Sequence, residues 1–280
     1  MKKTSLTANK NIGRRHSPAF RILFFALMII FALPAFFGCT AANASAPIEK
    51  LSDALRKEGT LPHDANAFTE GLFFHKGKLY ESTGLKNYSE IHADINLNTG
   101  KAASSIKLPD NAFGEGSCIM DDNLYVLTYT EGKVFVFDPQ SLTLKRTIDG
   151  YSREGWGLTT DGKKFYAGDG SSHLYVLDEN TKTTRTINIT DGGKPVENIN
   201  ELEWIDGKIW ANIWQSSDIV IINPENGKVE LRIDCSELKD SAPHENADDV
   251  LNGIAYDKTT GKIYLTGKRW QTMFVFSPRD

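Results

Sequence analysis

Two short stretches of the chain each place a glutamate between an aromatic residue and a glycine. FTEGLF begins at Phe68 and FGEGSC begins at Phe113, so Glu70 and Glu115 recur about 45 residues apart, each just ahead of an apolar run. A carboxylate held among aromatic side chains loses solvation, which raises its pKa and suits it to proton transfer near neutral pH. The two stretches are either the mark of a structural repeat or two parts of one acidic site.

The sequence carries no pattern typical of metal, phosphate or serine-nucleophile chemistry. There is no GxSxG elbow, phosphate-binding glycine loop or paired CxxC. Five histidines beyond the first 46 residues are scattered, without the spacing of zinc ligands: His63, His75, His92, His173 and His244. We therefore expect no metal site and no cofactor. The 32 basic and 36 acidic residues give a net charge of −4, which excludes an electrostatic footprint for nucleic acid.

Five segments of the chain share one pattern, and they position these residues. They begin at Phe68, Phe113, Glu154, Asn200 and Leu251. Each opens with a polar or aromatic cluster and a short apolar run, followed by a turn and an aromatic-rich run, and most continue into a third apolar run. Alternating β-branched and aromatic residues between Asp, Asn and Gly turns predict antiparallel meanders. A period of about 41 to 51 residues is typical of propeller blades. We predict an all-β fold, a five-bladed β-propeller of four-stranded antiparallel blades.

The chain divides into three predicted regions: a leader over residues 1–46, a linker and closing strand over 47–67, and the propeller domain over 68–280. The chain beyond Phe276 is too short to supply a fourth strand to the last blade. We expect the segment ALRKEGTL, from Ala54 to Leu61, to supply it. Joining the two ends in one sheet removes open strand edges.

The leader has the features of an export signal. A basic start precedes the apolar stretch ILFFALMIIFALPAFFG, and the small-residue segment CTAANASA follows. Cys39 after Gly38 resembles the lipidated cysteine of a bacterial lipobox, although Phe36 and Phe37 replace its usual residues. Cleavage after Ala44 and an uncleaved membrane span are the alternatives. We expect an exported monomer at the outer face of a membrane or in the periplasm, anchored by a lipid on Cys39 and without further membrane contact.

Cys118 and Cys235 are the remaining cysteines. An oxidising compartment permits a bridge between them. Buried free thiols in strands are the alternative that we favour.

A propeller brings distant residues to one mouth of its central channel, because the first strand of each blade lines that channel. The starts of these strands carry Glu70, Glu115, Trp156, Asn200 or Glu201, and Asn252. An apolar wall joins them: Phe68, Phe113, Tyr129, Trp156 and Trp214. A concave aromatic pocket with a few polar groups is the usual form of a small-ligand site. Alternatively, the polar groups only tie the blades together. The extra length between Arg232 and Asp249, with HENADD, predicts an insertion near the rim, either a selectivity element or a solvated loop.

Eight motifs occur in order at blade-like intervals: PHDANAFTEGL, LYESTGL, FGEG, EGWGL, NELEW, ANIW, LNGIAYD and TGKRW. Together, from Pro62 to about Phe276, they closely resemble the glutamine cyclotransferases of the plant and bacterial, papaya-latex type. The resemblance implies a five-bladed propeller, unrelated to the zinc-dependent animal enzymes. It also implies a glutaminyl-peptide cyclotransferase of the aminoacyltransferase class. Such an enzyme converts the amino-terminal glutamine of a peptide into pyroglutamate and releases ammonia, by intramolecular aminolysis without a metal.

The resemblance also implies roles for individual residues. Glu115 in FGEG matches the catalytic glutamate and would carry the proton. Asn200 in NELEW and Lys268 in TGKRW would orient the substrate and stabilise the oxyanion. The remaining expected substrate contacts are Phe68, Glu70, Phe113, Tyr129, Trp156, Trp214, Glu201 and Asn252.

The chain departs from the family pattern at two positions. Glu70 stands where the family often has glutamine, and Tyr129 stands where tryptophan is common. A second carboxylate beside Glu115 would raise its pKa further or bind the substrate ammonium. Tyr129 would alter the preference for the next substrate residue. Two other functions remain possible: a catalytically silent propeller that binds peptide amino termini, and a metal-dependent lactonase using Glu70, Glu115 and Asn252, which the aromatic wall and Lys268 fit poorly.

Overall fold

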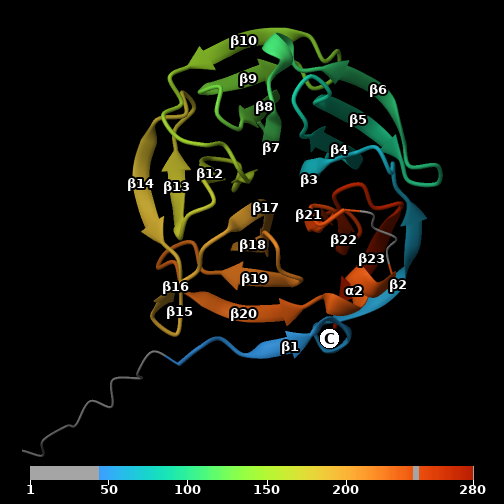
Figure 1. Cartoon of the computed structure of the whole chain (residues 1–280), viewed down its shortest axis with the longest axis vertical. Coiled ribbons are helices and arrows are strands. Elements are labelled where there is room, and N and C mark those ends of the chain that lie inside the picture. Colours follow the sequence, from blue (N-terminus) through green and yellow to red (C-terminus); the bar gives the residue numbers. More distant parts are fainter. Residues whose placement is uncertain (1–43, 242–245, 280) are drawn as a thin grey trace, which may run out of the picture. The chain divides into compact units, whose positions relative to one another are not determined.

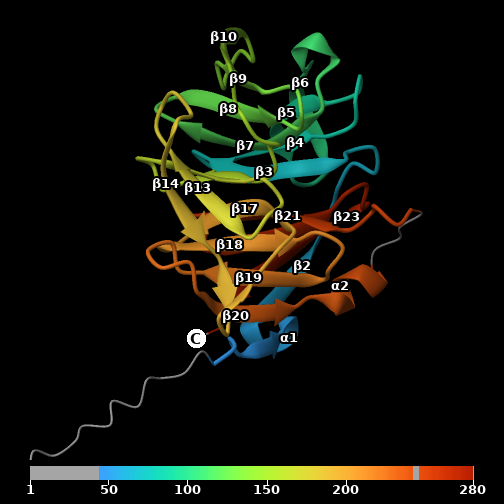
Figure 2. The ribbon, with the colours of Figure 1, turned by 60° about the vertical axis from the view of Figure 1, so that its left-hand side comes forward.

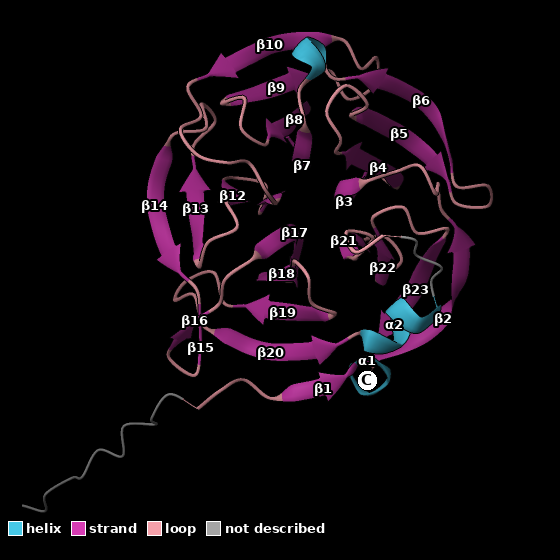
Figure 3. Ribbon diagram, in the orientation of Figure 1, coloured by secondary structure: helices cyan, strands magenta, loops and turns pink. Residues whose placement is uncertain are grey.

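A computed structural model describes residues 44–241 and 246–279, and strands make up nearly all of its regular structure (Figure 3). The predicted lipidation site Cys39 and the rest of the leader up to residue 43 lie outside the described residues. Within the described residues, no helix has the length and apolar character needed to cross a membrane.

The described strands form six sheets, of which five are blades and one is a two-stranded hairpin. Four consecutive strands make each of the first four blades. Blade 1 contains β3 (Thr69–His75), β4 (Lys78–Thr83), β5 (Glu90–Asn96) and β6 (Lys101–Lys107). Blade 2 contains β7 (Gly114–Met120), β8 (Asn123–Thr128), β9 (Lys133–Phe137) and β10 (Leu144–Asp149). Blade 3 contains β11 (Leu158–Thr160), β12 (Phe165–Gly168), β13 (His173–Leu177) and β14 (Thr183–Asn188). Blade 4 contains β17 (Ile199–Ile205), β18 (Lys208–Ile213), β19 (Asp218–Ile222) and β20 (Val229–Asp234).

Blade 5 joins the two ends of the described chain. It contains β21 (Leu251–Asp257), β22 (Lys262–Gly267), β23 (Thr272–Pro278) and, from the start of the chain, β2 (Leu55–Pro62). β2 and β23 run antiparallel, with Leu55 opposite Pro278 and Pro62 opposite Thr272. The remaining elements are short: β1 (Ile48–Lys50), α1 (Leu51–Ala54), the 3₁₀ turn η1 (Pro109–Asn111), the hairpin β15 (Thr190–Asp191) and β16 (Lys194–Pro195), and α2 (Ser236–Ser241).

The blades are arranged around a common centre, where β3, β7, β17 and β21 lie, while β6, β10, β14, β20 and β2 form the periphery (Figure 1). This confirms the predicted five-bladed β-propeller of antiparallel four-stranded blades. Figure 2 shows the blades turned, with β17 to β20 of blade 4 following one another outward. Three short strands were not expected: β15 and β16, which pair with each other, and β1. β1 adds to the outer edge of blade 4, parallel to β20. Its three exposed residues are too few to show an alternating pattern in the sequence.

Apolar packing lies between the blades. Five clusters of buried side chains occur in the described residues, and each draws its residues from two neighbouring blades. Both faces of a blade are therefore buried, which explains why middle strands such as β8 (NLYVLT) and β9 (KVFVF) are almost continuously apolar. Cys118 and Cys235 belong to two different clusters and are buried free thiols.

The inner strands share an irregularity near their first residues. The pairing of β3, β7, β17 and β21 with the second strand of the same blade shifts at Thr69/Gly71, Gly114/Ser117, Ile199/Leu202 and Leu251/Ile254. Each shift is a bulge or similar irregularity, and each contains at least one of the predicted polar site residues. Bulges redirect side chains and are common beside active sites. The repeated motif therefore marks a bulge as well as a blade.

Two glycines, Gly116 at the end of the FGEG motif and Gly157 in EGWGL, allow the inner strands to approach one another. A Cβ atom on Gly116 would lie 2.5 Å from the Trp156 carbonyl oxygen, and one on Gly157 would lie 2.0 Å from the Asn200 carbonyl oxygen. No side chain fits at these distances. Instead, the Gly116 N–H donates to the Trp156 carbonyl at 2.8 Å, joining blade 2 to blade 3 at the channel mouth.

A buried charge network holds the junction between blades 5 and 1. Glu81 on β4 contacts His63 Nε2 at 3.0 Å and His92 Nδ1 at 3.2 Å, and it accepts a hydrogen bond from the Thr69 hydroxyl at 2.7 Å. His63 Nδ1 lies 2.7 Å from the Trp270 carbonyl oxygen. Both ring nitrogens of His63 face acceptors, so the imidazolium satisfies both. Burial lowers the pKa of His63, but the Glu81 charge and these hydrogen bonds outweigh it, and the net shift is upward.

Because of this network, we expect the stability of the folded protein to fall at alkaline pH. The folded-state pKa values of His63 and His92 are raised, so their contribution is complete below the unfolded value of about 6.5 and is lost as pH rises through the folded values. The pKa of Glu81 is lowered, so its contribution is lost only in strong acid. Between about pH 6 and pH 9, the melting temperature of the wild type should therefore fall more than the melting temperature of Glu81→Gln. His92→Gln is the milder second variant, and equal slopes in all three proteins would contradict this account.

Candidate active site

A cavity of about 340 Å³ lies at the mouth of the channel where the inner strands begin. Its lining residues are Phe68, Glu70, Leu85, Phe113, Glu115, Tyr129, Trp156, Asn200, Trp214, Asp248 and Lys268. Nine of these were predicted from the sequence as site residues. They come from all five blades, so the predicted convergence of distant residues is present in the structure.

Two sets of equivalent backbone positions supply most of the lining. One set lies at the start of the inner strands, and it includes Glu70, Glu115 and Asn200. The other set follows the second strand of a blade by one or two residues: Leu85 after β4, Tyr129 after β8, Trp214 after β18 and Lys268 after β22. In blade 3 the corresponding loop contains Gly170, where a Cβ atom would lie 2.6 Å from the Trp156 ring. The missing side chain makes room for the indole.

The aromatic residues form two connected walls. The rings of Phe68 and Phe113 meet edge to face at 6.3 Å, and Phe113 lies 5.7 Å from the Tyr129 ring. Trp156 and Trp214 make an edge-to-face pair at 5.8 Å. Such geometry stabilises the rings in place beyond the burial of their area.

Glu115 is a buried acid that lines the cavity together with these walls. Its residue is 5% exposed, and no hydrogen bond to its carboxyl group is found among the described residues. Burial raises the pKa of Glu115 well above its ordinary value; the nearby Glu70 charge raises it further, while the Lys268 ammonium opposes the rise. A raised pKa moves a carboxyl group towards the range in which it can both accept and donate a proton near neutral pH.

Glu70 and Lys268 form a buried ion pair inside the cavity. Lys268 Nζ lies 2.7 Å from Glu70 Oε1. Lys268 is 5% exposed and Glu70 is 2% exposed. Burial raises the pKa of Glu70 above its ordinary value, and the Lys268 ammonium opposes the rise. The Lys268 ammonium also lies 4.5 Å from the centre of the Phe68 ring, a cation–π contact.

Two predicted substrate contacts, Glu201 and Asn252, do not line the cavity. The Glu201 carboxylate accepts hydrogen bonds from the backbone N–H groups of Leu72 at 3.3 Å and Ile254 at 2.9 Å, which ties β17 to β3 and β21. Asn252 Nδ2 donates to the Thr69 carbonyl at 2.8 Å and to Glu70 Oε2 at 3.3 Å. We therefore correct their assignment as substrate contacts. Glu201 joins blade 4 to blades 1 and 5, and Asn252 donates a hydrogen bond to Glu70 without lining the cavity.

Two lining residues, Leu85 and Asp248, were not identified as site residues from the sequence. Leu85 follows the LYESTG motif and has no chemical signature. Asp248 belongs to the insertion that was expected near the rim, and Gln215 Nε2 donates to its Oδ1 at 3.2 Å. Asp248 could have been predicted as a site residue because it is a charged residue within an insertion that was expected near the rim.

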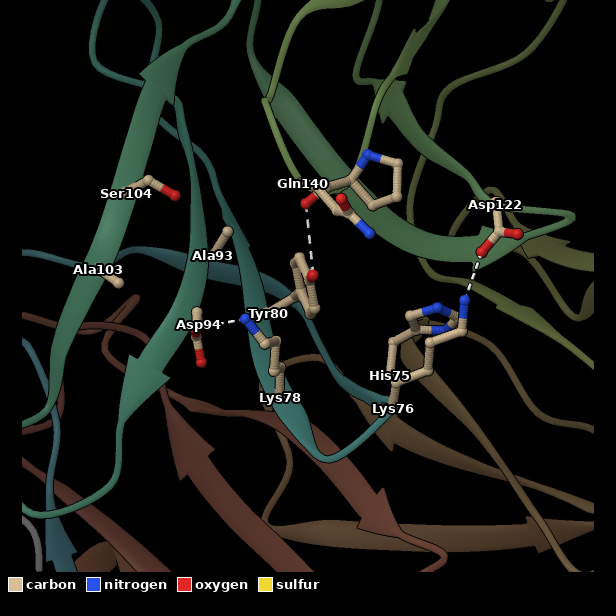
Figure 4. Close-up of a pocket in the computed structure, with 11 residues that line it drawn as sticks. His75, Lys76, Lys78, Tyr80, Ala93, Asp94, Ala103, Ser104, Asp122 and Gln140 are labelled. Carbon is tan, nitrogen blue, oxygen red and sulfur yellow. Dashed lines mark hydrogen bonds and ion pairs between the residues drawn. The ribbon is translucent and has the colours of Figure 1, made fainter.

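A second cavity of about 280 Å³ lies between blades 1 and 2 and differs in chemistry (Figure 4). Its lysines are paired: Lys76 with Asp122 at 2.6 Å, and Lys78 with Asp94 at 2.6 Å. This cavity offers no buried unpaired acid. Among the described residues, no group of three or more His, Cys, Asp or Glu side chains is placed to hold a metal ion.

Comparisons with known proteins agree with this geometry. The family described as glutamine cyclotransferase matches residues 31–277 of the chain. A glutaminyl-peptide cyclotransferase of Arabidopsis thaliana is 36% identical over 218 residues, which cover 76% of this chain and 68% of the relative. The crystal structure of Myxococcus xanthus glutaminyl cyclase matches with a TM-score of 0.75 and 34% identity, covering 85% of this chain and 100% of that one. The resemblance seen in the eight sequence motifs is confirmed, and the chain belongs to the glutamine cyclotransferase family.

Proposed function

We propose that the protein is a glutaminyl-peptide cyclotransferase that closes the amino-terminal glutamine of a peptide into pyroglutamate, releases ammonia and uses no metal. Family membership supports the cyclisation. The observation that carries the proposal is the buried Glu115 carboxyl group, which faces an aromatic cavity without a hydrogen-bond partner among the described residues.

The proposed reaction begins with the peptide's α-amino group. A free α-amine has a pKa of about 7.7 to 8.0, so a useful fraction is neutral near physiological pH. The amine nitrogen attacks the side-chain amide carbon, and a carbon–nitrogen bond forms as Glu115 removes a proton from the amine. The amide oxygen then carries the negative charge of a tetrahedral intermediate.

The same proton completes the reaction. Glu115 returns it to the amide nitrogen, the bond between that nitrogen and the carbon breaks, and ammonia leaves as the carbonyl re-forms. Lys268 and Asn200 both line the cavity, and we assign them to the oxyanion because they match polar site positions in the sequence resemblance. The aromatic walls hold the glutamine side chain in its bent conformation, which favours ring closure over reaction with water.

Glu70 is expected to set the pH at which Glu115 works. Its charge raises the pKa of Glu115, so Glu70→Gln should lower that pKa. The rise of kcat/KM on the acid side of the pH profile reports ionisation of the base, and it should move to lower pH. A glutamine at position 70 can still accept a hydrogen bond from Lys268, so activity should be kept. An inactive Glu70→Gln variant would show that Glu70 takes part in the chemistry itself.

A series of peptides tests the proposed function. Peptides with amino-terminal glutamine should gain the pyroglutamate mass, while acetylated glutamine, internal glutamine and amino-terminal asparagine peptides should remain unchanged. Binding of the glutamine peptide is followed in parallel through the fluorescence of Trp156 and Trp214. Binding without any mass change would instead support a silent propeller that captures peptide amino termini.

We also propose that the protein is an exported monomer, anchored by a lipid on Cys39 in the periplasm or at the outer face of a membrane. The basic start, apolar stretch and Gly38–Cys39 pair support this. Cys39→Ser should move the protein from the membrane fraction to the soluble fraction of the producing cell. If the wild type is soluble and begins at Ser45, cleavage after Ala44 replaces lipidation. Size-exclusion chromatography of the detergent-solubilised protein tests the monomer.

A further inference from the structure

The rim of the cavity carries carboxylates that the proposed reaction does not use. Glu154 and Asp248 are both exposed, and they stand beside the Trp156–Trp214 pair: Glu154 precedes Trp156 by two residues, and Asp248 lines the cavity with Trp214. Glu115 is buried and lines the same cavity. If the reacting amine lies at Glu115, as the proposed function requires, the rest of the peptide leaves past this rim.

Glu154 is fixed beside the Trp156 wall. Its Oε2 accepts a hydrogen bond from Trp156 Nε1 at 3.1 Å. A carboxylate has about four acceptor sites, so this bond leaves capacity for further donors. Tyr129 also lines the cavity, and its surroundings show that Glu154 is near: burial and then the Glu154 charge raise the pKa of the Tyr129 hydroxyl group.

The cations close to the cavity do not cancel this charge. Lys268 is paired with Glu70 at 2.7 Å, and Arg269 is paired with Asp249 at 2.6 Å. Lys86, next to the lining residue Leu85, is exposed on blade 1, across the mouth from blades 3 and 4. Arg153, which precedes Glu154, donates to the Thr183 hydroxyl group at 3.0 Å, and its guanidinium lies 3.8 Å from the centre of the Tyr175 ring. Among the described residues, negative charge therefore gathers on the side of Trp156 and Trp214. Their indole rings also attract cations.

We propose that this rim selects peptides with lysine or arginine among the two residues that follow the amino-terminal glutamine. Each residue of an extended chain spans about 3.3 to 3.6 Å, so the first residues outside the cavity pass the rim. A cationic side chain there meets the Glu154 and Asp248 carboxylates and an indole face. An acidic side chain meets two like charges. The selected substrate class is thus a basic peptide amino terminus beginning with glutamine.

Matched peptides with the sequences Gln-Lys-Ala-Ala, Gln-Ala-Ala-Ala and Gln-Glu-Ala-Ala, with a parallel set varied at the third residue, test the proposal. At low salt, kcat/KM should be about tenfold higher for the lysine peptide than for the glutamate peptide at one of the two positions. The ratio should fall as salt is added, because exposed charges are screened. In the double variant Glu154→Gln/Asp248→Asn the ratio should fall to about one. Glutamine at position 154 can still accept the Trp156 hydrogen bond, so the wall is preserved.

Asp122→Asn is the matched control, since it removes one exposed negative charge in the groove between blades 1 and 2 and leaves the mouth unchanged. Its lysine-to-glutamate ratio should equal that of the wild type. Equal turnover of all three peptides by the wild type at both positions, or an unchanged ratio in the double variant, would overturn the rim proposal while leaving the proposed function intact. Failure of every peptide to form pyroglutamate would overturn the proposed function itself.

Discussion

Replacing Glu115 by glutamine is expected to lower kcat for glutamine peptides by about two to four orders of magnitude, while peptide binding persists. An amide of the same shape can neither take the proton from the attacking amine nor deliver it to the leaving nitrogen. The loss should appear in kcat rather than KM, because the proton moves only during the reaction. Steady-state ammonia release and fluorescence-detected binding measure the two effects separately.

The fold should tolerate this change. Glu115 is buried and its raised pKa reflects the free energy that burial costs its charged form, so a neutral amide should leave the melting temperature unchanged or higher. Glu225→Gln, at an exposed position on blade 4, is the control for loss of one carboxylate and should keep full activity. A Glu115→Gln protein that is folded, binds peptide and retains wild-type kcat would show that another group carries the proton.

Lys268→Met is expected to damage both stability and catalysis, and a second substitution separates the two effects. Removing the ammonium leaves Glu70 buried without its partner, a loss of about 3 to 5 kcal/mol for typical buried pairs. For a domain of this size that corresponds to roughly 6 to 20 °C in melting temperature, reduced where Glu70 takes up a proton. The missing oxyanion donor should lower kcat by about two to three orders of magnitude.

Adding Glu70→Gln to Lys268→Met removes the second half of the pair. The double variant has no unpaired charge at this point, so its melting temperature should recover most of the loss. Its kcat should stay low, because no cation faces the oxyanion. Recovery of activity together with stability would mean that Lys268 acts only by neutralising Glu70.

The repeat in the sequence predicted the architecture and brought the site residues together. The spacing of the five segments corresponds to five blades, and the first strands place Glu70, Glu115 and Asn200 at one mouth. Equivalent positions in the five blades can be identified by counting strands, and the alternation of apolar residues makes the strands countable. The roles of these residues came from family resemblance and stay predictions.

Other features could not be predicted, because they depend on local backbone geometry. The bulges at the start of four inner strands decide which side chains face the cavity, and a shift of one residue turns a side chain to the opposite face of a strand. Glu201 and Asn200 are adjacent, yet only Asn200 lines the cavity. The pairing of Glu70 with Lys268 joins residues 198 positions apart in the sequence. The strand β1 was missed because three residues carry too little pattern.

Glu70 and Tyr129, which the sequence resemblance marked as departures from the family pattern, both line the cavity. The charge of Glu70 acts on Glu115, and its carboxylate is paired with Lys268. Tyr129 belongs to the aromatic wall, and the Glu154 charge acts on its hydroxyl group. We expect the first to shift the pH dependence of the reaction and the second to influence which peptide enters.

The most direct test of the account measures ammonia and pyroglutamate together, using purified wild-type protein dialysed against a chelator and a peptide with amino-terminal glutamine. The account predicts equal amounts of the two products at the rate seen before chelation. Pyroglutamate formation that stops in chelator and returns when a divalent metal is added would contradict the proposed metal-free proton transfer by Glu115.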